Sequence, residues 1–137
     1  MSVRAESTDT GSVLPLVYVI DSDPAVRSGL ATLICALDVD VATCASAEEF
    51  FDALDPLRAA CVVTEAHLPG MSGTQLQQEL AARHLNVGVI MIAADSDVPL
   101  AVRAMRHGAI DFIEKPFVEG VLLRRIRQAI ARRHREG

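Results

Sequence analysis

Short apolar runs alternate along this chain with longer stretches in which apolar positions recur every three or four residues. The short runs predict buried strands at 16–20, 39–44, 60–64, 87–92 and 110–113. The longer stretches predict helices at 24–36, 46–54, 72–83, 97–107 and 118–133. Strands and helices that alternate at near-constant spacing predict an α/β fold: a doubly wound, five-stranded parallel sheet with helices on both faces.

Local signals support the predicted helix starts. Asp23 stands before Pro24, a pairing typical of an N-cap followed by the first helical turn. We therefore expect Asp23 to cap a helix rather than to bind a ligand. Ser46 and Glu49 have the spacing of a capping box, and Asp97 is placed to cap the helix at 97–107.

Length and composition are consistent with one domain. The chain has 137 residues, half of them apolar, which is enough for a continuous core. Its first residues are polar and lack the pattern of a signal peptide. We expect a disordered lead-in at 1–14, the folded domain at 15–134 and a short tail at 135–137.

Charge and cysteine content narrow the class of protein. The net charge of −5 argues against general nucleic-acid binding, although arginines gather near the C-terminus, where we expect a solvated helix face. Contact with DNA would need an attached domain. Cys35, Cys44 and Cys61 lack metal-binding or redox spacing, which indicates reduced thiols and a cytoplasmic location. No apolar run approaches the ~18 residues of a membrane helix, so we expect no membrane contact.

Polar side chains follow several of the predicted strands. Ligands and chemistry gather at the carboxyl ends of the strands in such sheets. The residues there are Asp21 and Ser22 after the first strand, Glu65 after the third, Ala93 after the fourth and Lys115 after the fifth. Lys115 is the only lysine in the chain, and its expected counter-charges are Asp21 and Glu65.

The sequence resembles the receiver domains of two-component response regulators, over about residues 15–134. The resemblance is strongest to receivers that precede LuxR-type DNA-binding domains in nitrogen-fixation-type regulators. The matching segments are Val19 to Arg27, Ala45 to Phe50, Leu68 to Gly73, Asp97 to Val102 and Gly108 to Phe117. The resemblance implies a flavodoxin-like sheet of strand order 2-1-3-4-5.

The resemblance also assigns roles at the strand ends. In this family, two acids after strand one and an aspartate after strand three hold Mg²⁺, and that aspartate accepts a phosphoryl group from a histidine kinase. A Thr or Ser after strand four and a lysine contact the phosphoryl oxygens, and an aromatic residue in strand five acts as a switch. Asp21, Lys115 and the aromatic Phe112 match this pattern.

The sequence departs from the family at three positions. Ser22 replaces the second acid, Glu65 replaces the phosphoacceptor aspartate and Ala93 replaces the hydroxyl residue. One carboxylate fewer should make any Mg²⁺ site at Asp21 and Glu65 weak or absent, so we expect no cofactor. The longer Glu65 side chain misplaces the attacking oxygen, and a misplacement of about 1 Å can cost on the order of a hundredfold in rate.

These departures predict an atypical receiver with no catalytic residue: a protein-interaction module, not an enzyme, that works without phosphorylation. A standing Glu65–Lys115 ion pair would hold it active-like. The alternative is a conventional receiver that controls transcription and is phosphorylated at Glu65 or a nearby acid.

Two other classes fit less well. The Asp-Ser-Asp run at 21–23 is similar to the start of haloacid-dehalogenase-type phosphatases, but no later acidic metal motif follows Lys115. An FMN carrier would need a glycine- and hydroxyl-rich phosphate loop where the chain has two acids.

The expected partners are proteins. They are a histidine kinase or another regulator, and a second copy that forms a symmetric dimer through the face at 97–133. Charges of both signs on that face, Asp111 and Arg125 among them, would form pairs across the dimer.

Overall fold

The computed structural model describes residues 14–93, 99, 106 and 111–136. Its strands are β1 (Leu16–Ile20), β2 (Asp40–Cys44), β3 (Ala59–Glu65), β4 (Gly88–Ala93) and β5 (Asp111–Glu114). Its helices are α1 (Pro24–Ile34), α2 (Ala47–Ala53), α3 (Gly73–Ala82) and α5 (Glu119–Glu136). The predicted strands and four of the predicted helices are confirmed, within a few residues at their ends. The helix expected at 97–107, with its cap at Asp97, lies outside the described residues apart from Pro99 and Arg106.

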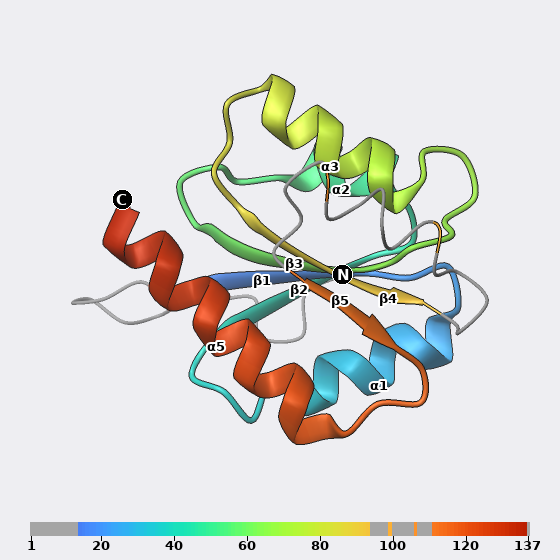
Figure 1. Cartoon of the computed structure of the whole chain (residues 1–137), viewed down its shortest axis with the longest axis vertical. Coiled ribbons are helices and arrows are strands. Elements are labelled where there is room, and N and C mark those ends of the chain that lie inside the picture. The colour runs from blue at the N-terminus through green and yellow to red at the C-terminus, as the bar shows by residue number, and fades with distance from the viewer. Residues whose placement is uncertain (1–13, 94–98, 100–105, 107–110, 137) are drawn as a thin grey trace.

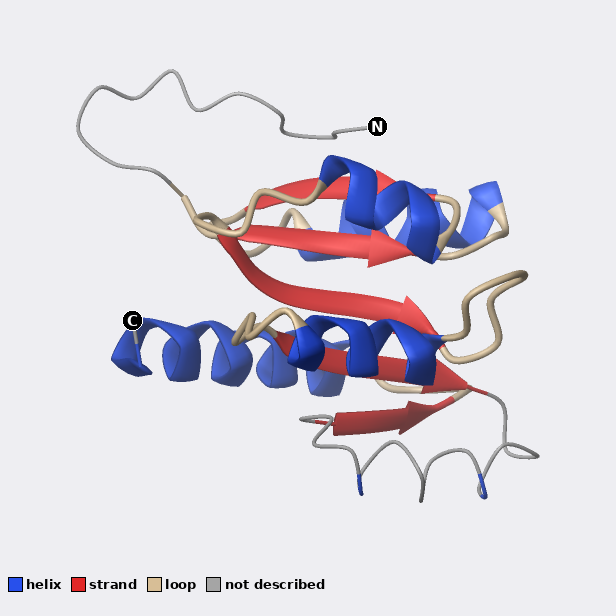
Figure 2. Ribbon diagram, turned by 90° about the horizontal axis from the view of Figure 1, so that it is seen from above, coloured by secondary structure: helices blue, strands red, loops and turns tan. Residues whose placement is uncertain are grey.

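The strands form one parallel sheet in the order β2-β1-β3-β4-β5, as predicted. Helices α1 and α5 cover one face and α2 and α3 cover the other (Figure 1). All five arrows point the same way in Figure 2, so their carboxyl ends share one edge of the sheet. The predicted fold class is therefore confirmed, and the strand-end residues are brought to a common edge.

Successive residues of each strand contribute to opposite faces, because side chains alternate along a β-strand. Val17 and Val19 of β1 belong to the core beneath α1 and α5, whereas Tyr18 and Ile20 belong to the core beneath α2 and α3. Neither core is exposed to water, which explains why the strands read as continuous apolar runs.

Side-chain caps start three of the helices. The Asp23 carboxylate accepts a hydrogen bond from the backbone N–H of Ala25, which confirms the predicted cap. Ser46 caps α2 through the N–H of Glu49, but the Glu49 carboxylate accepts from the N–H of Ala45, one residue before the position that a full capping box requires.

The complete capping box lies on α3 and was not predicted. There Ser72 accepts from the N–H of Gln75, and the Gln75 side chain accepts from the N–H of Ser72. The glutamine at the third helical position supplies the same carbonyl-type acceptor as the more familiar glutamate.

The predicted domain limits stay predictions. Residues 1–13 of the expected lead-in are not described, but the carbonyl of Leu14 accepts a hydrogen bond from Arg58. Helix α5 continues to Glu136, three residues past its predicted end. None of the helices among the described residues is long and apolar enough to cross a membrane.

Candidate functional site

The residues predicted at the strand ends lie around one edge of the sheet. Asp21 follows the last residue of β1, and Glu65 ends the neighbouring strand β3. Glu65 is level with Ile92 of β4, and Ala93 pairs with Glu114 of β5. The backbone N–H of Lys115 then donates to the carbonyl of Ala93, at 2.8 Å. Parallel pairing thus brings together residues that lie far apart in the sequence.

Ser22 binds the Glu65 carboxylate directly. Its backbone N–H and its hydroxyl both donate to the same oxygen, Oε2 of Glu65, at 3.2 and 3.1 Å. Ser22 is exposed and Glu65 is half-buried. Ser22 therefore contributes one backbone donor and one side-chain donor to the Glu65 carboxylate.

This contact replaces the predicted ion pair. Among the described residues no ion pair joins Glu65 to Lys115, and the Lys115 side chain is exposed. The Glu65 carboxylate contacts Ser22 because the backbone N–H and the hydroxyl of Ser22, on the neighbouring loop, are both within hydrogen-bonding distance. The idea that a Glu65–Lys115 pair holds the protein active-like finds no support in this geometry.

Asp21 is the buried acid of the site, with 4% of its surface exposed. Burial raises the pKa of Asp21, and the charge of the adjacent Glu65 raises it further. The N–H of Asp23, which donates to Oδ1 of Asp21 at 2.8 Å, and the charge of Lys115 both act in the opposite direction. Lys115 is thus an electrostatic neighbour of Asp21, as expected for a counter-charge.

Asp21 and Glu65 are the carboxylates of the site that would hold Mg²⁺, if the site binds it. Octahedral Mg²⁺ is bound through carboxylates and waters placed around it. One Asp21 oxygen accepts from the Asp23 N–H and one Glu65 oxygen accepts from Ser22, and each carboxylate has further lone pairs that are not used in these bonds. Across the residues with assigned positions, no three His, Cys, Asp or Glu side chains form a cluster that could hold a metal ion.

Two glutamates support the loops beside the site. Glu65 ends β3, and the loop that follows it is held by Glu48 of α2, whose Oε2 accepts from the N–H of Met71 at 3.0 Å. The turn there requires Gly70, since its φ is +75° and a Cβ would lie 2.9 Å from that carboxylate oxygen. Sequence reasoning missed the role of Glu48, because nothing local links α2 to this loop.

Gly73 and Arg27 were also missed. A Cβ on Gly73 would lie 3.1 Å from the carbonyl oxygen of Glu65, so a larger residue there would push the start of α3 away from the end of β3. Arg27 of α1 donates to the carbonyl of Asp21 at 2.7 Å and fixes the loop that carries Ser22. The only signal for Arg27 was its place in the family-like segment after strand one.

Phe112 pairs with Met91 in the sheet and is half-buried against the core beneath α2 and α3. The aromatic position of the family pattern therefore faces inward, in a chain whose neighbouring strand ends in the small Ala93.

Residues 17–127 match the family model of the response regulator receiver domain. The chain belongs to this receiver family. The FixJ transcriptional regulatory protein of Azorhizobium caulinodans is 43% identical to the receiver over 121 residues, which cover 88% of this chain and 57% of FixJ. The response regulator protein TmoT of Ectopseudomonas mendocina is 36% identical over 127 residues, which cover 93% of the receiver and 56% of TmoT.

Solved structures agree with this assignment. The receiver matches the response regulator StyR with a TM-score of 0.83 at 37% identity, over 90% of this chain and 63% of StyR. It matches full-length FixJ from B. japonicum with a TM-score of 0.82 at 36% identity, over 89% of this chain and 60% of FixJ. The chain thus spans little more than half the length of these relatives, which are named as regulators and not as enzymes of metabolism.

Proposed function

We propose that this receiver is a signalling module that acts through protein contacts without phosphorylation of Glu65. The observation that carries the proposal is the double hydrogen bond from Ser22 to the Glu65 carboxylate. Phosphoryl transfer depends on positioning and on cations that neutralise the transferring oxygens. In this site a neutral donor occupies the place of a metal-binding acid, and Ala93 offers no hydroxyl.

A conventional receiver is the second candidate. It is favoured by the retained Asp21 and Lys115, whose charges act on one another, and by the similarity to transcriptional regulators. In that case an acid of the site would accept the phosphoryl group, with a histidine kinase as donor and an attached DNA-binding domain as the output. The two candidates differ in one measurable property, which is covalent phosphorylation.

The test is incubation with Mg²⁺ and acetyl phosphate, read by intact mass. We expect no phosphoryl adduct on the natural chain and none on Glu65→Asp, because Ser22 and Ala93 remain. The triple variant Ser22→Asp, Glu65→Asp, Ala93→Thr restores each family residue and should gain the adduct, which shows that the assay works. An adduct on the natural chain, lost in Glu65→Gln, would establish the conventional receiver instead.

A symmetric dimer through the 97–133 face stays a prediction. Most of 97–110 lies outside the described residues. The charges expected to pair across the dimer are in part used within the chain, because Arg125 of α5 forms an ion pair with Asp111 of β5. That contact ties α5 to the edge strand of its own sheet.

A further inference from the structure

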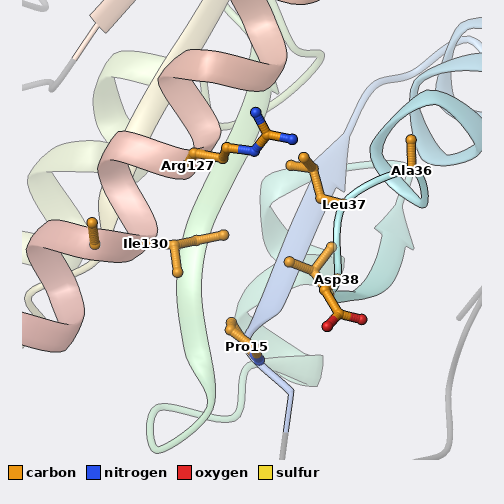
Figure 3. Close-up of a pocket in the computed structure, with 8 residues that line it drawn as sticks. Pro15, Ala36, Leu37, Asp38, Arg127 and Ile130 are labelled. Carbon is orange, nitrogen blue, oxygen red and sulfur yellow. The ribbon is translucent and has the colours of Figure 1, made fainter.

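An apolar groove opens at the end of the sheet where the strands begin, opposite to the strand-end site. It has a volume of about 580 Å³ and lies between α5 and the loop that joins α1 to β2. Figure 3 shows Arg127 and Ile130 of α5 on one side of the groove and Leu37 on the other, with Pro15 below them. The walls are mainly apolar, with the exposed Arg127 as a positive charge on the α5 side and the exposed Asp38 as a negative charge on the side of the α1–β2 loop.

An exposed leucine stands at the same edge of the sheet. Leu57 lies two residues before β3, close to the end of the sheet where Pro15 and Val39 directly precede β1 and β2. Its surface is 92% exposed, and it takes no part in lining the groove of its own chain. Scattered apolar residues on a surface need no explanation by themselves. Leu57 is informative because of the turn that carries it.

The Leu57 turn is held rigidly. The Asp55 side chain accepts from the N–H of Leu57 at 3.0 Å, and the Asp55 carbonyl accepts from the N–H groups of Arg58 and Ala59. The N–H of Asp55 donates to the hydroxyl of Tyr18 at 2.8 Å. A side chain displayed on a fixed turn loses little conformational entropy on binding, which favours its use as an anchor.

The same chain therefore carries an exposed apolar side chain, Leu57, and an apolar groove at the same end of the sheet. Arg133 of α5 donates to the carbonyl of Pro56, so the turn lies near the last turns of the helix that forms the groove wall. A twofold axis through this edge would exchange the two features between copies, as a closed symmetric contact requires. The exposed Asp52 precedes the turn, and of the two charges that line the groove, Arg127 on the α5 side would attract it and Asp38 on the opposite side would not.

We propose that the groove is the docking site for the Leu57 turn of a second copy of this chain. Two such contacts form one symmetric pair through the edge where the strands begin. This end of the sheet is opposite to the strand-end site, and it shares with the predicted 97–133 face only the last turns of α5, at Arg127, Ile130 and Ala131. The contact is small beside the 1,200–2,000 Å² or so of a stable interface, so the dissociation constant should be on the order of 100 µM.

The test is sedimentation equilibrium at concentrations up to about 1 mM, a range that covers the expected dissociation constant. Leu57→Glu removes the anchor, and Ala131→Trp fills the groove at an exposed position. Each should weaken self-association by about tenfold or more, as loss of an anchor contact does. Val118→Glu is the matched control, because Val118 is the other large apolar residue that is exposed among those the structure describes, and it directly precedes α5. It should leave this association unchanged.

Mixing the variants gives a second readout. A Leu57→Glu chain keeps its groove and an Ala131→Trp chain keeps its Leu57, so a mixed pair regains one of the two contacts. The mixture should associate more tightly than either variant alone. The proposal is overturned if the chain stays monomeric at the highest concentration, if Val118→Glu alone weakens the pair, or if mixing gives no gain.

Discussion

At the scale of the residue, the site is defined by what each substitution does to its neighbours. Ser22 binds the Glu65 carboxylate through its backbone N–H and its hydroxyl. Asp21 is left as a buried acid next to another carboxylate, with Lys115 as its counter-charge. The carboxylates of Asp21 and Glu65 therefore repel each other, and this repulsion should lower the free energy of unfolding.

Replacement of Asp21 tests this repulsion. Because its pKa is raised in the folded state, ionised Asp21 lowers stability above its folded pKa, and this penalty disappears as the pH falls to its unfolded pKa. Asp21→Asn keeps an oxygen that can accept from the Asp23 N–H and should stabilise the protein at neutral pH by roughly 0.5–2 kcal/mol. Urea unfolding from neutral pH to about pH 4 should show the gain shrink as the pH falls. A gain that is constant with pH would exclude the electrostatic explanation, and Asp38→Asn serves as the exposed control.

At the scale of the element, the arginines of α5 make tertiary contacts that the sequence did not predict. Its arginines were expected to lie on a solvated face. Arg125 instead pairs with Asp111, and Arg133 donates to the carbonyls of Asn86 and Pro56, at 2.7 and 3.0 Å. Arg124, Arg127 and Arg132 are exposed, in agreement with the prediction. The pattern of charges along a helix does not reveal which of them reach backbone groups of distant loops.

Comparison of Arg133→Ala with Arg132→Ala distinguishes an arginine that binds distant carbonyls from one that is exposed to solvent. Arg133→Ala removes donors to two carbonyls at the edge of the sheet and should lower the free energy of unfolding by about 1–2 kcal/mol. Arg132→Ala, one residue away on the exposed face, should change it by less than about 0.5 kcal/mol. Chemical denaturation of both variants measures the difference. Equal effects would mean that the contacts of Arg133 contribute nothing beyond helix propensity.

At the scale of the whole molecule, the sheet divides the interior into two cores that fold around the same strands. Cys61 lies in the core beneath α1 and α5, and Cys44 lies in the core beneath α2 and α3. Burial raises the pKa of Cys61 to about 12 and that of Cys44 to about 11. Neither thiol should react in the native state, since the thiolate is the reactive form.

The cysteines can therefore report on cooperativity. In native protein at about pH 8, below the usual thiol pKa, a disulfide reagent should modify only the half-buried Cys35 rapidly. In Cys35→Ser, labelling of Cys44 and Cys61 should be slow and should accelerate in parallel with urea, because both cores open in one transition. Mass spectrometry of partly labelled chains measures the two rates. Different dependences on urea would show that the cores open separately.

Much of this protein follows from local pattern. Apolar runs placed the strands, Asp23 with Pro24 placed the start of α1, and family-like segments fixed the strand order. The strand-end residues could be named because all strands of a parallel sheet end at one edge. The sequence predicted Lys115 as the partner of Glu65, but the carboxylate contacts Ser22, because the hydrogen bonds of a side chain depend on how neighbouring loops are placed in the fold.

The sequence by itself determined the strands, the helices and the residues at the strand ends, since these depend on residue type and periodicity, and the resemblance to receivers supplied the strand order. Only the tertiary structure decided that Glu65 binds Ser22, that Arg133 holds the turn before β3, and that an apolar groove and an exposed leucine share the opposite edge. These features join residues distant in the chain. Their formation depends on the register of the sheet and the packing of helices on it, which no local pattern encodes.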